Sequence, residues 1–122
     1  MSDEIVFKRI SEIGISIRTN GYWYIKDAIR LAVDDPKMLI YISKNLYHEL
    51  AAKYGITIQA VERTIRYAIT QAWEKSRSEG GDFWNKMDEI TGGRKPTNLE
   101  FLTLYRESPI NECPKLDRCA RI

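Results

Sequence analysis

Apolar residues recur every three or four positions through most of this chain, which is the spacing of one buried helix face. The expected helices run over residues 2–13, 22–34, from 36 onward, 46–54, 57–77, 82–91 and 97–105. Whether the helix from Pro36 continues into 46–54 is left open, so the pattern gives about six helices. Asn20-Gly21 is interpreted as a turn. No segment alternates long enough for a sheet, and we therefore predict an all-α, single compact domain.

The strongest of these patterns is TIQAVERTIRYAITQAW, residues 57–73. One face of this helix is apolar, and the other carries a set of polar residues, here called the polar face: Gln59, Glu62, Arg63 and Arg66. Guanidinium groups can donate a two-pronged hydrogen bond to guanine O6 and N7, and a carboxylate can accept from cytosine N4. Taken alone, the helix is more typical of an ordinary amphipathic helix with a solvated, salt-bridged outer side.

The residues before it favour DNA binding. The predicted helix 46–54 is followed by Gly55, which can adopt the left-handed conformation that ends a helix, and by Thr57, which can cap the next one. Ala51 is small where two steeply crossing helices need close approach. Helix, glycine turn and helix at these spacings form the helix-turn-helix pattern, whose second helix enters a major groove.

Candidate DNA contacts follow from this placement. Arg63 and Arg66 would read guanines, Glu62 a cytosine or its neighbour, and Gln59 an adjacent base or phosphate. The candidate contacts to the DNA backbone are Thr57, His48 and Lys53.

The composition limits the class of protein but does not identify its function. The 122 residues are 43% hydrophobic and 30% charged, with a net charge of +2, which is modest for a DNA-binding protein. Between Lys44 and Arg77 there are six basic and three acidic residues, so the basic excess is local. We expect a DNA-binding domain over residues 1–106 and a loose tail over 107–122.

The tail contains both cysteines, Cys113 and Cys119, which are too few for a disulfide framework or a four-ligand zinc site. Free thiols are the favoured interpretation, and a local disulfide in the tail is the alternative. No leader peptide and no membrane-spanning run is found, so we expect a soluble cytoplasmic protein with no membrane partner.

Catalytic motifs are missing from the sequence. There is no phosphate-binding glycine loop followed by Lys-Ser/Thr, no nucleophile elbow, and only one histidine, His48. We therefore expect no enzyme activity, no cofactor and no metal.

Three separated motifs, NGYWYIKDAI (20–29), VERTIRYAITQAW (61–73) and KPTNLEF (95–101), resemble the DNA-binding effector domain of the sporulation master regulator, a response regulator of endospore-forming bacteria. The resemblance covers residues 5–105. It implies an all-helical domain that reads a short promoter element in double-stranded DNA, often as two copies on tandem sites. It also implies base contacts by Glu62, Arg63 and Arg66.

The resemblance further implies contact with the sigma subunit of RNA polymerase through residues 78–93. Phe83 and Met87 are expected to pack in the core, and Trp84 is left open between packing and partner contact. The chain departs from the family at Ala60, where a basic residue is frequent, and at Tyr67, where a histidine is familiar. The sequence begins directly with the part that resembles the effector domain, and whether it is a stand-alone protein or a fragment of one with a receiver domain is left open.

The alternative to DNA binding is a protein-interaction module that dimerises with, or titrates, a full-length relative. Its candidate surface lies on the last helix, at Phe101, Leu104 and Tyr105, although Phe101 is expected in the core.

Overall fold

The computed structural model describes residue 10 and residues 13–107, and its regular elements are all helical. Their bounds are α2 Asn20–Asp34, η1 Pro36–Leu39, η2 Ser43–Tyr47, α3 His48–Tyr54, α4 Ile58–Glu79, α5 Asp82–Thr91 and α6 Asn98–Glu107. These described residues contain no strand, so the all-α prediction is confirmed. The α-helices are slightly fewer than predicted, because η1 is a 3-10 helix and η2 a single π-helical turn.

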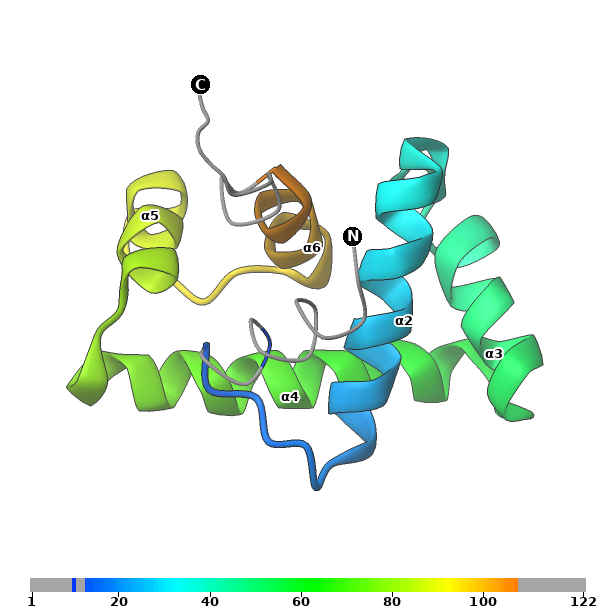
Figure 1. Cartoon of the computed structure of the whole chain (residues 1–122), viewed down its shortest axis with the longest axis horizontal. Helices are drawn as coiled ribbons and strands as arrows, with labels where there is room; N and C mark the ends of the chain where they lie inside the picture. Colours follow the sequence, from blue (N-terminus) through cyan, green and yellow to red (C-terminus); the bar gives the residue numbers. More distant parts are fainter. Residues whose placement is uncertain (1–9, 11–12, 108–122) are drawn as a thin grey trace.

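The longest element, α4, is the support on which the others are placed. It spans 22 residues, or roughly 33 Å at 1.5 Å per residue. In Figure 1, α2 crosses α4, and α3, α5 and α6 stand on one side of it. Val61, Ile65 and Ile69 are fully buried on that side. One face of α4 is therefore held by the fold, and the opposite face stays in solvent.

The start of α2 corrects the turn predicted at Asn20-Gly21. These two residues form the first helical turn, because the Thr19 hydroxyl caps it by accepting from the Tyr22 N–H at 3.3 Å. A Cβ at Gly21 would lie 2.6 Å from Ala68 Cβ. Gly21 is thus required by the close crossing of α2 over α4, which sequence-local turn chemistry does not reveal.

The connection between α2 and α3 settles the question left open at Pro36. One 3-10 turn ends at Leu39, and Tyr41 then takes a left-handed conformation with φ 52° before the π turn begins. The Asn45 side chain closes this bend by donating to the carbonyls of Lys37 and Ile40. No continuous helix therefore runs from Pro36 to Tyr54.

Packing of α5 decides the role of Trp84. This residue is only 2% exposed, and its Nε1–H donates to the Ile13 carbonyl at 2.8 Å, so Trp84 belongs to the core. Phe83 and Met87 are buried as predicted. Ile90, which follows Phe83 and Met87 at helical spacing, is 56% exposed. The buried residues of α5 lie in its first two turns, and the last turn extends past them.

The sequence Thr97-Asn98-Leu99-Glu100 forms a capping box at the start of α6. The Thr97 N–H donates to Glu100 Oε1 at 2.8 Å, and the Glu100 N–H donates to Thr97 Oγ1 at 3.1 Å. Both Arg94 guanidinium ends donate to the same carboxylate, at 2.7 and 3.0 Å. Helix α5 has the predicted bounds, with Gly81 before it and Asp82 as its first helical residue.

The face of α6 proposed for protein interaction is not on the surface. Phe101 and Tyr105 are 0% and 2% exposed, and both rings lie against Phe83. Leu104 is partly buried against the same core. Phe101 is thus in the core as expected, and the prediction that Tyr105 forms part of a docking surface is wrong, because the aromatic cluster with α5 already covers it.

Two predictions about the ends of the chain lie outside the described residues. They are the helix over residues 2–13, except for its buried Ile10 and Ile13, and the tail with Cys113 and Cys119. Among residues 10 and 13–107, no helix has both the length and the hydropathy needed to cross a bilayer.

Replacing Gly21 with alanine tests the close crossing of α2 over α4. An ordinary helical Gly→Ala change stabilises by about 0.5–1 kcal/mol, but here the added methyl would overlap Ala68. We expect Gly21→Ala to lower the free energy of unfolding by about 1–3 kcal/mol in urea titrations. The cost should fall in an Ala68→Gly background. A stabilising Gly21→Ala would show that the crossing is loose.

Glu100 gives a pH-dependent test of the capping box. The Arg94 guanidinium, followed by the Thr97 N–H, lowers the pKa of Glu100 to about 2, against about 4.3 in an unfolded chain. A lowered folded-state pKa stabilises the fold above about pH 4.3, and this stabilisation is lost as the pH falls toward 2.

We therefore expect Glu100→Gln to cost about 1 kcal/mol at pH 7, a value that allows for solvent screening of a partly exposed pair. The difference from the wild type should shrink steadily in unfolding titrations from pH 5 to pH 3. Glu89→Gln, at an exposed site on α5, is the control and should change little at any pH. A Glu100→Gln cost that is constant with pH would contradict the ionised cap.

Candidate nucleic-acid interface

The structure contains the predicted helix-turn-helix. Helix α3 ends at Gly55, which has φ 67° in the left-handed region. Thr57 begins the next helix, because its Oγ1 accepts from the Ala60 N–H at 3.0 Å. Leu50 of α3 and Val61 of α4 are fully buried, and Ile56 fills the angle between the two helices as a partly buried residue. The second helix of this unit is α4.

The polar face of α4 lies on the exposed side of the helix. Gln59 and Arg63 are exposed, and among the described residues neither side chain has a hydrogen bond or ion-pair partner. Arg66 Nη1 lies 3.2 Å from the Glu62 carboxylate, one helical turn away, with the two side chains 54% and 36% exposed. The fold therefore presents one unpaired guanidinium and one Arg–carboxylate pair to solvent.

Tyr67 extends this surface by one turn. It is 62% exposed, and its phenol oxygen accepts from Gln71 Nε2 at 2.9 Å. The sequence singles out Tyr67 only as a departure from the family, whereas the structure shows it beside the polar face.

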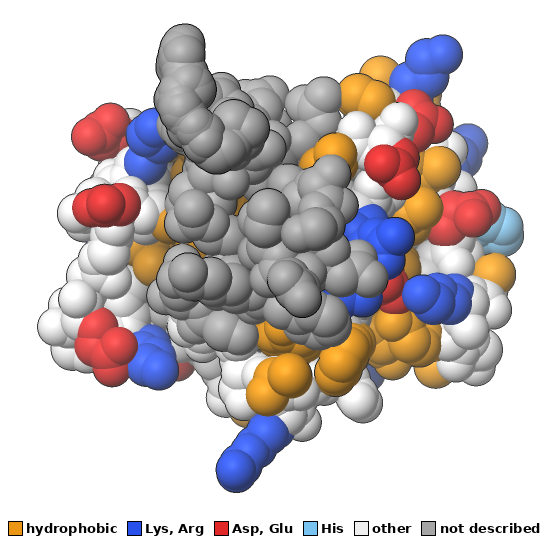
Figure 2. Space-filling view, in the orientation of Figure 1, with side chains coloured by type: hydrophobic (Ala, Val, Ile, Leu, Met, Phe, Trp, Pro, Cys, Tyr) orange, Lys and Arg blue, Asp and Glu red, His pale blue; other side chains and the backbone are white. Residues whose placement is uncertain are grey.

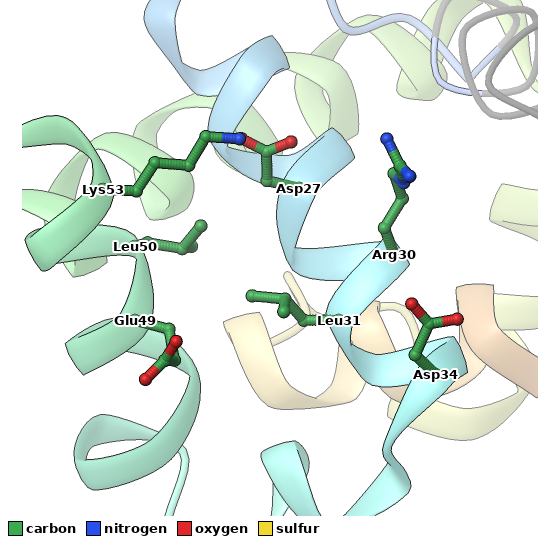
Figure 3. Close-up of a pocket in the computed structure, with 7 residues that line it drawn as sticks. All are labelled: Asp27, Arg30, Leu31, Asp34, Glu49, Leu50 and Lys53. Atoms are coloured by element: carbon green, nitrogen blue, oxygen red, sulfur yellow. The ribbon is translucent and has the colours of Figure 1, made fainter.

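Of the three candidate backbone contacts, Thr57 and His48 lie at the starts of α4 and α3 and are exposed. Lys53 is different, because its Nζ lies 2.8 Å from Asp27 Oδ2 on α2 (Figure 3). The Tyr54 hydroxyl donates to the same carboxylate oxygen. Burial, followed by this hydrogen bond, raises the pKa of Tyr54 above its ordinary value, so the phenol keeps its proton and remains a donor. Lys53 and Tyr54 thus fasten α3 to α2.

The groove between α2 and α3 holds about 310 Å³ and carries both signs of charge (Figure 3). It is lined by Asp27, Arg30, Leu31, Asp34, Glu49, Leu50 and Lys53. Nowhere in the part of the chain that the structure describes do three His, Cys, Asp or Glu side chains gather as metal ligands would. The ion pair between Lys53 and Asp27, both in the lining of this groove, joins α3 to α2.

Sequence reasoning missed Asn98, which ties α6 to α4. Its buried Nδ2 donates to the Tyr47 hydroxyl at 3.0 Å and to the Glu62 backbone carbonyl at 3.1 Å. Burial raises the pKa of Tyr47, so its phenol stays neutral beside the amide. One side chain therefore links α6, η2 and α4 at the level of Glu62. The capping-box pattern places Asn98 at the helix start but gives no sign of this long-range bond.

The face shown in Figure 2 has Lys and Arg side chains interspersed with Asp and Glu. The net charge of the whole chain is +2. With so small a net charge, electrostatic attraction alone would give only weak binding to nucleic acid.

The family model described as sporulation initiation factor Spo0A C terminal matches residues 6–108, which is most of the chain. The chain belongs to this family. It is a family of DNA-binding regulatory domains rather than a class of enzymes. The resemblance inferred from the three sequence motifs is therefore confirmed.

Removal of the Asn98 amide tests its role as the tie between α6 and α4. Asn98→Ala leaves the buried Tyr47 hydroxyl without its donor, and we expect the free energy of unfolding to fall by about 1–3 kcal/mol. Asn85→Ala, at an exposed position of α5, is the matched control and should stay within about 0.5 kcal/mol. Equal effects of the two substitutions in urea titrations would remove Asn98 from this role.

Proposed function

We propose that this chain is a sequence-specific transcription regulator that places the polar face of α4 in a DNA major groove. The observation that carries the proposal is the two-sided character of α4. Its apolar side is sealed in the core, while Gln59, Glu62, Arg63 and Arg66 are left on the other side. A helix held in this way, as the second helix of a helix-turn-helix, is what major-groove recognition requires.

The role of each side chain follows from its donors and acceptors. Arg63, which has no competing partner among the described residues, can donate both guanidinium ends to one guanine. Arg66 would read a second guanine, and Glu62 would accept from a cytosine amino group or its neighbour. Gln59, closer to the start of the helix, would contact an adjacent base or phosphate.

Contacts to the DNA backbone would set the register. Thr57 and the nearby N–H groups lie at the start of α4, where a phosphate is favoured by the helix dipole. His48 and the exposed part of Lys53 are the other proposed backbone contacts. Since Lys53 already pairs with Asp27, its contribution should be smaller than that of an unpaired lysine.

Two partners would add to this interface. The modest net charge of +2 supports binding as two copies on tandem sites, because two half-sites raise affinity without more charge per copy. Contact with the sigma subunit of RNA polymerase through residues 78–93 would use the exposed side of α5, where Ile90 lies. Trp84 cannot take part in it, since that side chain is buried.

The arginines provide the decisive test. We expect Arg63→Ala or Arg66→Ala to weaken binding to a site selected from a random duplex library by about 1–3 kcal/mol. Binding to random DNA should change much less. Fluorescence anisotropy on both duplexes measures the two affinities, and Lys86→Ala on α5 is the control.

Two outcomes would contradict the proposal in different ways. Equal losses on selected and random DNA would reduce Arg63 and Arg66 to phosphate contacts. Failure of the wild-type protein to retain any duplex, even at low salt, would favour the interaction-module alternative.

A further inference from the structure

A second surface adjoins the polar face of α4. It is a groove of about 410 Å³ between η2, α4 and the segment that leads into α6, and it is here called the α6 groove. Glu62 and Arg66, both members of the polar face, form one of its walls. The groove is lined by Ile42, Ser43, Tyr47, Glu62, Arg66, Lys95, Pro96, Thr97, Asn98 and Leu99. Its surface is therefore continuous with the proposed base-reading surface.

The uncompensated charge of the α6 groove is positive. Lys95 is exposed, and the described part of the chain offers its ammonium group no partner. The nearby acids are already compensated, because Glu62 lies 3.2 Å from Arg66 and Glu100 lies 2.7 Å from Arg94. An anionic partner in the groove would thus meet a lysine that has no competing carboxylate.

The walls of the groove combine this charge with hydroxyl and apolar groups. Ser43 and Thr97 supply hydroxyls, and since Thr97 Oγ1 accepts from the Glu100 N–H, its own proton remains available for donation. Ile42 and Leu99 supply apolar surface. A sugar–phosphate chain offers the matching chemistry, with charged phosphates alternating with largely apolar deoxyribose rings.

The position of the α6 groove beside α4 indicates which part of a DNA molecule would bind in it. A major groove is about 12 Å wide and a helix with its side chains is about 10–12 Å across, so the phosphates of both strands run along the flanks of an inserted helix. The α6 groove is such a flank, because it shares Glu62 and Arg66 with the polar face. We propose that the α6 groove binds the sugar–phosphate backbone of one DNA strand, with Lys95 paired to a phosphate. This inference rests on the proposed function.

The support of Lys95 favours a positioning contact. The residues around it are fixed by the Asn98 bonds to Tyr47 and Glu62 and by the Arg94–Glu100 pair. The backbone that carries Lys95 is therefore held at a fixed place beside α4, and a phosphate bound there would lie at the flank of the helix whatever the base sequence.

Salt dependence tests the contact. We expect Lys95→Gln to weaken binding to the selected duplex by roughly three- to tenfold at 0.1 M salt and to flatten the slope of log affinity against log salt by about 0.9. The same flattening is expected on random DNA, so the ratio of the two affinities should stay constant. Lys95→Arg should restore the slope. Lys86→Gln removes an equal charge from an exposed site on α5 and should leave the slope nearly unchanged.

A footprint provides an independent measurement. Amine acylation followed by mass spectrometry should show that the selected duplex protects Lys95, while Lys86 reacts equally with and without DNA.

The outcomes separate this inference from the proposed function. An unchanged slope for Lys95→Gln, an equal flattening by Lys86→Gln, or an unprotected Lys95 would each overturn the contact, even if Arg63→Ala still abolished site preference. A wild-type protein that binds no duplex would overturn the proposed function and the contact with it.

Discussion

One side of α4 is buried in the core through Val61, Ile65 and Ile69. The burial of each of these side chains stabilises the fold by about 1.5–3 kcal/mol. Two contacts on the flanks prevent α4 from rolling about its axis. Gly21 of α2 comes close to Ala68, and Asn98 of α6 is bonded to the Glu62 carbonyl. The direction in which Glu62, Arg63 and Arg66 point is therefore a property of the core, and substitutions on the polar face should alter recognition without altering the fold.

The sequence predicts an element of this fold well where its cause lies in neighbouring residues. It predicts an element poorly where the cause is a contact with a distant segment. Helix α4 is predicted well because its apolar residues keep the helical spacing over a long segment, and because Gly55 and Thr57 mark its start. The capping box at Thr97 and Glu100 is equally local. Asn20-Gly21 is misinterpreted because the dipeptide is typical of turns, whereas the reason for Gly21 lies on another helix. Residues 36–47 are too short and irregular for a period to develop, so the 3-10 and π turns could not be foreseen.

In the candidate site, too, the features on one helix could be predicted from the sequence, and the contacts between distant segments could not. A helical wheel is enough to group Gln59, Glu62, Arg63 and Arg66, since all four lie on one helix. The partner of Lys53 and the role of Asn98 need contacts between segments far apart in the sequence, namely Lys53 with Asp27 and Asn98 with Glu62. The α6 groove is hidden from the sequence for that reason. Lys95 and Arg66 line the same groove only because α6 packs on α4.

The Glu62–Arg66 pair bears on how a weakly charged protein can discriminate between DNA sites. An exposed pair one helical turn apart is worth about 0.3–0.5 kcal/mol, whereas a two-pronged arginine–guanine contact gives about 1–3 kcal/mol of discrimination. Breaking the Glu62–Arg66 pair therefore costs less free energy than the contact between Arg66 and the correct guanine contributes. A single phosphate is a poorer competitor, because the Glu62 carboxylate one helical turn away repels the same anion. In the proposed complex, the carboxylate thus lowers the affinity for random DNA more than the affinity for the right site, which makes it part of the selectivity rather than an obstacle to binding.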